Sequence, residues 1–270
     1  MPRNFNYRLI TGVFVQDNVA HVPSTEQILP KFGLIGDEWP DIDALNANAA
    51  AGINYKLIFA GRHGQGFHNV AERNYPTDEW ERHWSRINTD GELVWGPDAL
   101  LTELGVEQAK HAASQWATYT GPRPALYLCS PLRRTLHTFS LTFKGSDVVA
   151  RVREGVRERV TGHTCDYRSK VSELKSFAAT IEGEGNVFDW SEFDGIEEDP
   201  SAGTFETYEE RDARVKVALD TIFANENANV VSITTHAGFI RGLDAVLGRP
   251  DSVLPTGGIA PFLVEAVDYT

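Results

Sequence analysis

The chain of 270 residues is poor in cysteine, in long apolar runs and in basic residues, and each shortage excludes a class of protein. Its 2 cysteines, Cys129 and Cys165, are too few for a disulfide framework, so we expect a reducing compartment. No apolar run approaches the roughly 20 residues that a membrane-spanning helix needs, and the N-terminus leads into no signal-like apolar segment. These observations predict a cytoplasmic or nuclear protein without a membrane partner.

Basic residues are outnumbered by acidic ones. The chain has 25 Lys and Arg against 38 Asp and Glu, which gives a formal net charge of −13 at pH 7. Nucleic-acid-binding proteins usually carry a basic footprint, so we expect no nucleic-acid partner. The negative charge also provides no general attraction for an anionic substrate, so a phosphate site must be a local pocket of arginine and histidine. The sequence leaves the oligomeric state open.

Strand-like apolar segments alternate with amphipathic helices along most of the chain. Expected strands cover 55–60, 125–129, 148–152, 230–235 and 259–267. Expected helices cover 41–51, 130–143 and 207–225, with a further helix that starts at Thr102 and another that ends at Leu247. Pro261 favours an edge position for the last strand. This alternation predicts an α/β fold, a three-layer sandwich with a mostly parallel central sheet flanked by helices.

The length fits a single domain over residues 1–270 with accessory segments. Segment 1–54 is loop-rich but carries aromatic residues, so we expect an N-terminal arm packed on the body. Segment 70–98 is polar and aromatic, with helical character early and turn signals later, and segment 155–169 is irregular. We expect 70–98 and 155–206 to form cap or loop excursions near the functional site. Within the second, the acidic run 182–199 is typical of a solvated surface.

Polar side chains follow three of the expected strands. They are Arg62, His63, Ser130, Arg134 and His236. Open parallel sheets bind ligands beyond the carboxyl ends of their strands, so these groups should converge. Arginine suits phosphate oxygens, and a histidine that is neutral near pH 7 can be a nucleophile. The convergence therefore predicts a site for phosphoryl chemistry.

Several spaced motifs resemble those of the histidine phosphatase superfamily, in its phosphoglycerate-mutase-like branch of fungal and plant type. The motifs are Arg62-His63-Gly64 with Asn69, Leu101-Thr-Glu-Leu-Gly-Val-Glu-Gln-Ala109, Ser130-Pro-Leu-Arg-Arg134-Thr-Leu-His-Thr138 and Thr235-His236-Ala-Gly238. The resemblance implies a phosphoglycerate-mutase-like fold and hydrolysis through a phosphohistidine. It covers residues 53–270 well and the preceding residues more loosely.

The resemblance also implies residue roles. His63 would be the nucleophile, and the groups that hold the phosphoryl oxygens would be Arg62, Asn69, Arg134 and His236. His236 is expected to donate in its protonated form. The glycine that follows the nucleophile, Gly64, is expected to let the backbone approach the substrate closely.

A glutamate should act as general acid. Val156-Arg-Glu158 with Gly162 resembles the acid element of the family, so we choose Glu158, and Glu154 is the alternative. Glu158 would start protonated and give its proton to the leaving oxygen. As a carboxylate it would then activate water.

Two features bear on specificity. Where many family members have Glu-Ser after Arg-His-Gly, this chain has Gln65-Gly66, so the leaving-group preference does not carry over. Four further residues are candidate substrate contacts or plain packing: Phe67, His68, Arg73 and Arg168.

We expect neither a cofactor nor a metal. His63 and His68 are five positions apart, unlike the four-apart pair of a helical zinc site, and no His-Glu-x-x-His occurs. Cys165, close to His163, is expected to be structural.

The expected function is a metal-independent phosphomonoester hydrolase that acts on a small phosphorylated metabolite. Three alternatives stay open: a phosphomutase of the same fold that needs a bisphosphate primer, a biosynthetic phosphatase for a phosphorylated or diphosphorylated specialised metabolite, and a non-catalytic binding module. The intact histidines and arginines argue against the binding module. The stretch around Glu158 does not resemble the fuller acid motif of cofactor-dependent mutases, which argues against the mutase.

Overall fold

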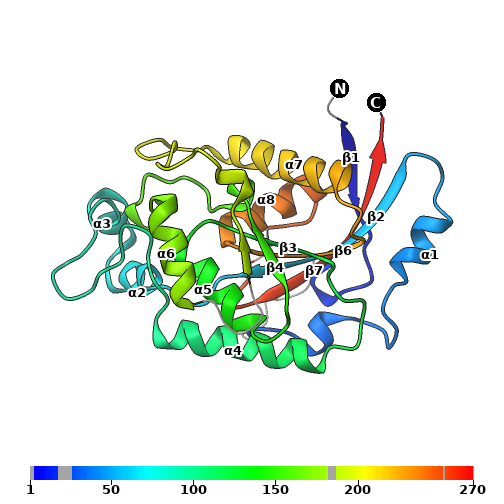
Figure 1. Ribbon diagram of the computed structural model, residues 1–270, viewed down its shortest axis with the longest axis horizontal. Helices are drawn as coiled ribbons and strands as arrows, with labels where there is room; N and C mark the ends of the chain where they lie inside the picture. The colour runs from blue at the N-terminus through cyan, green and yellow to red at the C-terminus, as the bar shows by residue number, and fades with distance from the viewer. Residues whose placement is uncertain (1–2, 18–25, 182–186, 252, 270) are drawn as a thin grey trace.

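The computed structural model describes residues 3–17, 26–181, 187–251 and 253–269 (Figure 1). Within these residues a seven-stranded sheet has the order β1-β7-β2-β6-β3-β4-β5. The strands are β1 Phe5–Leu9, β2 Ile53–Arg62, β3 Leu126–Cys129, β4 Val149–Val152, β5 Val187–Asp189, β6 Val230–Thr235 and β7 Ile259–Asp268. Strands β2, β6, β3, β4 and β5 run parallel, and β7 is antiparallel to β1 and β2. The predicted mostly parallel sheet is confirmed.

Helices cover both faces of the sheet. They are α1 Ile42–Ala47, α2 Phe67–Asn74, α3 Thr77–Arg82, α4 Glu103–Thr118, α5 Arg133–Thr142, α6 Val171–Ile181, α7 Tyr208–Asn225 and α8 Ala237–Leu247. Figure 1 shows α7 on one side of the strands and α4 on the other. None of the described helices is long and apolar enough to cross a membrane.

Two hydrophobic cores lie on opposite faces of the sheet. Side chains of α4, α5 and α6 pack in the first core, and those of α7 and α8 pack in the second. In β2, Leu57 and Phe59 belong to the first core. Ile58 and Ala60 belong to the second, as expected because successive strand residues point to opposite faces. The three-layer sandwich predicted from the sequence is therefore confirmed.

The edge position predicted for β7 from Pro261 is wrong. This strand lies between β1 and β2, and Pro261 is paired with Phe59 of β2. However, β1 reaches only as far as the pair Leu9 and Val264. Pro261 therefore lies beyond the end of β1 and has one strand neighbour, so its missing N–H breaks no ladder bond on that side.

Two helices begin where the sequence predicted, and a third begins elsewhere. The hydroxyl of Thr102 accepts the Gly105 N–H at the start of α4, and Thr207 caps α7 in the same way. Helix α5, however, begins at Arg133 and not at the expected Ser130-Pro131. The Oγ of Ser130 lies 2.7 Å from Nε2 of a distant histidine, so it is not used as a cap.

The accessory segments have different surroundings. In segment 1–54, Phe14 and Phe32 are buried in the first core. Between residues 67 and 98, Trp80 and Trp95 form a small core of their own. The first residues of the acidic run 182–199 lie outside the described residues. Most acidic residues of the remainder are exposed, but the Asp199 side chain is 3% exposed and lies in an ion pair with an arginine.

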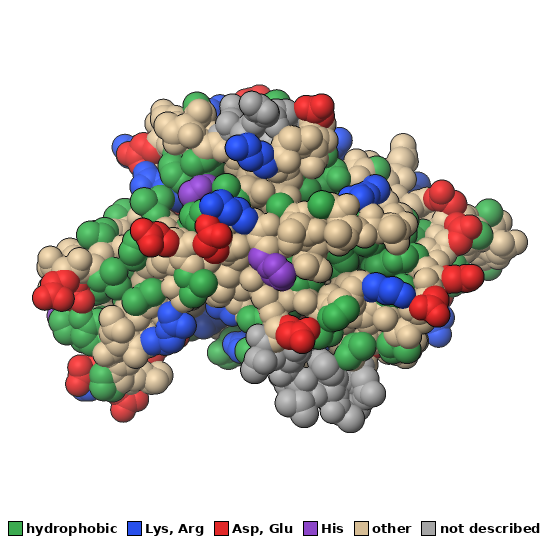
Figure 2. All heavy atoms as spheres, turned by 90° about the horizontal axis from the view of Figure 1, so that it is seen from below, with side chains coloured by type: hydrophobic (Ala, Val, Ile, Leu, Met, Phe, Trp, Pro, Cys, Tyr) green, Lys and Arg blue, Asp and Glu red, His purple; other side chains and the backbone are tan. Residues whose placement is uncertain are grey.

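The surface beneath α4 is mixed in charge. Figure 2 shows acidic and basic side chains interspersed on the face that looks down in Figure 1. On that face the net negative charge is spread out and does not form one large patch.

Two glycines hold the loop after β2 against the start of α4. A Cβ on Gly64 would overlap the carbonyl oxygen of Gly105, and a Cβ on Gly105 would overlap that of Gln65. The Gly64 N–H is donated to Oγ1 of Thr138 at 3.0 Å. The close approach thus fixes the backbone next to His63.

Replacing Gly64 by alanine tests this packing. Gly64→Ala should lower the free energy of unfolding by about 1–3 kcal/mol, because overpacking forces the backbone of two elements apart. Urea denaturation measures the change. The control is Gly155→Ala, whose Cβ would meet the Ala218 Cβ at an ordinary 3.7 Å and should change stability by less than about 0.5 kcal/mol. Equal losses in the two variants would show that the contact does not matter.

Candidate active site

A cavity of about 370 Å³ opens where β2 and β6 end. Its walls come from the segments 62–81, 158–166, 208–211 and 237–241. The sequence-predicted site residues that line it are Arg62, His63, Asn69 and Glu158. The strand ends therefore meet at one place, as the polar residues after them predicted.

His63 follows β2 and is 1% exposed. Its Nδ1 lies 2.7 Å from the carbonyl oxygen of Gly64. A carbonyl only accepts, so Nδ1 carries the proton and Nε2 keeps the lone pair. Burial, and then the positive charges of Arg134 and Arg62, hold the pKa of His63 well below its usual value. His63 is thus a neutral imidazole with a free lone pair, which is the form that a nucleophile needs.

Two arginines supply positive charge beside His63. Arg62 lines the cavity and donates from Nη1 to the Leu254 carbonyl at 2.8 Å. Arg134 is fully buried behind the wall, and donates from Nη1 to the Cys165 carbonyl at 2.6 Å and from Nη2 to Oδ1 of Asp166 at 3.0 Å. The buried Nε of each arginine has no hydrogen-bond partner among the described residues. Each guanidinium therefore has N–H groups that no acceptor in the described part of the protein uses.

His236 is also fully buried behind the cavity wall, and its ring centre lies 5.1 Å from that of His63. Its Nε2 lies 2.7 Å from Oγ of Ser130, and its Nδ1 has no partner among the described residues. Burial, followed by the charge of Arg134, holds the pKa of His236 well below its usual value. This shift favours a neutral ring in the protein without a ligand, whereas the expected protonated donor belongs to the complex with the phosphoryl group. If Nε2 accepts the Ser130 hydroxyl, Nδ1 carries the proton and can still donate.

Glu158 brings a carboxyl group into the same cavity. Its Oε1 accepts the Arg159 N–H at 2.8 Å. A Cβ on Gly238 would overlap this oxygen, so the glycine of the His-x-Gly motif makes room for the acid. Burial and then the charge of Asp166 raise the pKa of Glu158. A carboxyl with a raised pKa is suited to donate a proton near neutral pH.

The alternative acid, Glu154, lies elsewhere. It does not line the cavity. Its Oε1 is 2.6 Å from Nη1 of Arg157, and its Oε2 is 3.2 Å from Nε of Arg168. Glu154 is thus engaged in ion pairs outside the cavity, and the geometry favours Glu158 as the general acid.

Asn69 and Gly64 differ in what they offer a substrate. Asn69 lines the cavity, but its Oδ1 accepts the Gly66 N–H at 3.0 Å at the start of α2. Its amide group is then left as the donor. Gly64 does not line the cavity, and its N–H is already given to Thr138. The structure thus explains Gly64 by its packing against Gly105.

The four candidate specificity residues differ in whether they line the cavity. Of the four, His68 lines the cavity, whereas Phe67, Arg73 and Arg168 do not. His68 is 8% exposed, its ring centre lies 5.4 Å from that of His63, and its buried Nδ1 has no partner among the described residues. Gln65 also lies outside the cavity, and its Oε1 accepts the Thr102 hydroxyl at 2.9 Å. At this position, where the chain departs from the family pattern, the side chain thus makes a hydrogen bond within the protein and does not line the cavity.

Other lining residues were not singled out from the sequence. They include Glu72, Arg159, Tyr208, Arg211 and Arg241. They lie on helices and loops that are far apart in the chain, and none belongs to a spaced motif. Only their position in the fold marks them.

Comparison with known proteins gives the family. The histidine phosphatase superfamily (branch 1) matches residues 58–269. The chain belongs to this superfamily, as its motifs predicted.

Several relatives are named phosphoglycerate mutases. The chain is 35% identical over 289 residues to a probable phosphoglycerate mutase of Arthroderma benhamiae, with 96% of this chain and 84% of that protein covered. It is 30% identical over 237 residues to one of Saccharomyces cerevisiae, with 78% and 79% covered. Among solved structures, the alpha-ribazole phosphatase of Shigella flexneri is 16% identical at a TM-score of 0.47, over 79% of this chain and 96% of that one. The superfamily and the two fungal relatives support an enzyme.

The lowered pKa of His63 should appear in the pH dependence of stability. Unfolded His63 has a pKa of about 6.5, so below that pH the unfolded state binds more protons than the folded state and stability falls as the pH drops. His63→Ala should therefore make the slope of the unfolding free energy between about pH 6.5 and 5 shallower, by up to about 1.4 kcal/mol per pH unit. Urea titrations at several pH values measure it. The exposed control His111→Ala should keep the wild-type slope, and an unchanged slope in His63→Ala would contradict the neutral ring.

Proposed function

We propose that the protein is a metal-independent phosphomonoester hydrolase that acts through a phosphohistidine on a small phosphorylated metabolite. The observation that carries this proposal is the state of His63. It is neutral, its Nδ1 proton is held by the Gly64 carbonyl, and its Nε2 lone pair is free beside two guanidinium groups. Glu158 stands in the same cavity with a raised pKa.

In the first step, Nε2 of His63 attacks the phosphorus in line with the ester oxygen, and the bond to that oxygen breaks. The positive charges of Arg62 and Arg134 stabilise the negative charge on the equatorial phosphoryl oxygens. Nδ1 of His236 and the Asn69 amide add two further donors. Glu158 gives its proton to the departing oxygen.

In the second step, the Glu158 carboxylate takes a proton from water. The water oxygen attacks phosphorus, the bond to Nε2 breaks, and inorganic phosphate leaves. His63 is then neutral and Glu158 is protonated again. A dianionic substrate would raise the Glu158 pKa further, which favours the protonated form at the start of each cycle.

A phosphomutase is the second candidate, because two relatives carry the name phosphoglycerate mutase. It would use the same first step but return the phosphoryl group to a bound acceptor. A biosynthetic phosphatase for a specialised metabolite would share both steps and differ only in substrate. A binding module would retain the donors without turnover.

Phosphate release in excess chelator tests the proposed activity. The purified protein should hydrolyse at least one compound from a panel of sugar phosphates, nucleotides, phosphoglycerates and prenyl diphosphates. His63→Ala should abolish release, since it removes the nucleophile, whereas His111→Ala should retain it. Release by His63→Ala at the wild-type rate would contradict the phosphohistidine. Isomerisation of a phosphoglycerate that needs added bisphosphate, without release, would identify the mutase.

The role of Glu158 predicts a dependence on the leaving group. Glu158→Gln should slow hydrolysis of an alkyl phosphate by about 10²–10⁴-fold, because general acid catalysis is lost. An activated aryl phosphate needs less protonation and should be slowed less. Glu154→Gln serves as the matched control and should affect both classes alike. If Glu158→Gln lowers both rates by the same factor, Glu158 is not the acid.

A further inference from the structure

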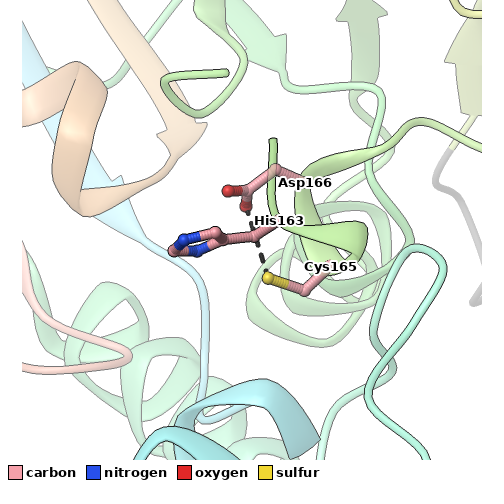
Figure 3. Close-up of side chains that lie close together, drawn as sticks. All are labelled: His163, Cys165 and Asp166. Carbon is pink, nitrogen blue, oxygen red and sulfur yellow. Dashed lines mark hydrogen bonds between the residues drawn. The ribbon is translucent and has the colours of Figure 1, made fainter. Parts of the chain in front are cut away.

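A second cluster of side chains lies on the wall of the same cavity. It consists of His163, Cys165 and Asp166, at the short helix η5 (Thr164–Asp166) and the residue before it. One ring nitrogen, the Sγ atom and one carboxylate oxygen all lie within 4.8 Å of one another. Figure 3 shows the three side chains extending to the same side of η5.

We propose that this cluster binds one divalent cation of the Zn²⁺ class and that its occupation inhibits the enzyme. The inhibition, but not the binding, rests on the proposed phosphatase function. In a tetrahedral zinc site, with Zn–S of about 2.3 Å and Zn–N or Zn–O of about 2.0–2.2 Å, the ligand atoms lie about 3.3–3.7 Å apart. Sγ of Cys165 is already 3.8 Å from Oδ1 of Asp166. Since the three ligand atoms lie within 4.8 Å of one another, the site needs a closure of about 1.5 Å at most.

The donor set selects the kind of cation. A thiolate sulfur and an imidazole nitrogen suit zinc and other borderline-soft metals, whereas Mg²⁺ and Ca²⁺ prefer oxygen ligands alone. Three protein ligands leave a fourth position for water. The other free cysteine, Cys129, is buried in the first hydrophobic core and has no such companions among the described residues.

The groups around the cluster hold its ligands in place. Oε2 of Glu81 lies 3.1 Å from Nε2 of His163, so that nitrogen can donate to the carboxylate while Nδ1 is left to bind the cation. Oδ2 of Asp166 accepts the Thr161 hydroxyl at 2.6 Å, and its Oδ1 accepts from Arg134. A carboxylate behind a ligating histidine and hydrogen bonds to a ligating carboxylate are the usual supports of a metal site.

Binding replaces a proton by the cation. The Cys165 thiol loses its proton to solvent and its sulfur bonds to the metal, with no change of oxidation state. The positive charge of Arg134 opposes the cation, whereas the carboxylates of Asp166 and Glu81, of which Glu81 lies next to His163, favour it. The cation would share Asp166 with Arg134 and occupy space that the substrate enters. Turnover should fall for both reasons.

Cobalt titration of the chelator-treated full-length protein tests binding without using activity. Co²⁺ should produce a thiolate-to-metal charge-transfer band that saturates at one equivalent and disappears when Zn²⁺ is added. Cys165→Ser should abolish the band, and His163→Gln should weaken binding by about 10–100-fold or more. Cys129→Ala is the matched control and should behave as wild type. No band in folded wild-type protein, or a band that survives Cys165→Ser, would overturn the site.

Inhibition is measured separately, on a substrate that the protein hydrolyses in chelator. Half-inhibition of Cys165→Ser should need about a hundredfold more Zn²⁺ than wild type, with each rate compared to its own metal-free value, while Cys129→Ala should match wild type. Equal sensitivity of Cys165→Ser and wild type, or activation by Zn²⁺, would overturn the inhibitory role. Absence of any metal-free turnover would count against the proposed function alone, since the cobalt titration still decides on the site.

Discussion

The buried guanidinium of Arg134 is the constraint on which the rest of the site depends. The side chain is fully buried and its charge is met by Asp166 at 3.0 Å. Removing one partner of such a buried pair typically costs about 3–5 kcal/mol, because the other charge is left uncompensated. The same charge contributes to the lowered pKa values of His63, His68 and His236. Burial is the larger cause of the lowered pKa in all three, and this one cation adds to it.

The surrounding fold supports this arrangement through close packing. Gly64 and Gly105 allow the loop after β2 to touch α4, and Gly238 leaves room for the Glu158 carboxyl. The parallel order of β2, β6 and β3 then brings the ends of three strands together. The elements that carry the functional side chains are therefore positioned by the packing on both faces of the sheet.

Asp166 links the proposed chemistry with the proposed cation site. It holds Arg134, raises the pKa of Glu158 and belongs to the cluster with His163 and Cys165. A cation at this carboxylate would therefore act on the phosphate-binding charge and on the acid together. The local electrostatics of one loop, residues 161–166, would couple the two proposed functions, although the proposed reaction itself uses no metal.

The sequence by itself determined the alternation of strands and helices and the motifs at the strand ends, because both depend on residues that are close in the chain. It could not show that β1 and β5 join the sheet, since β1 pairs with a strand more than 250 residues away and β5 has only three residues. Tertiary structure alone placed Glu158 in the cavity and Glu154 outside it, His68 at the cavity wall and Gly64 in a packing contact, and brought Glu81 to His163. Those outcomes depend on distances between segments remote in sequence, and only the packed fold sets such distances.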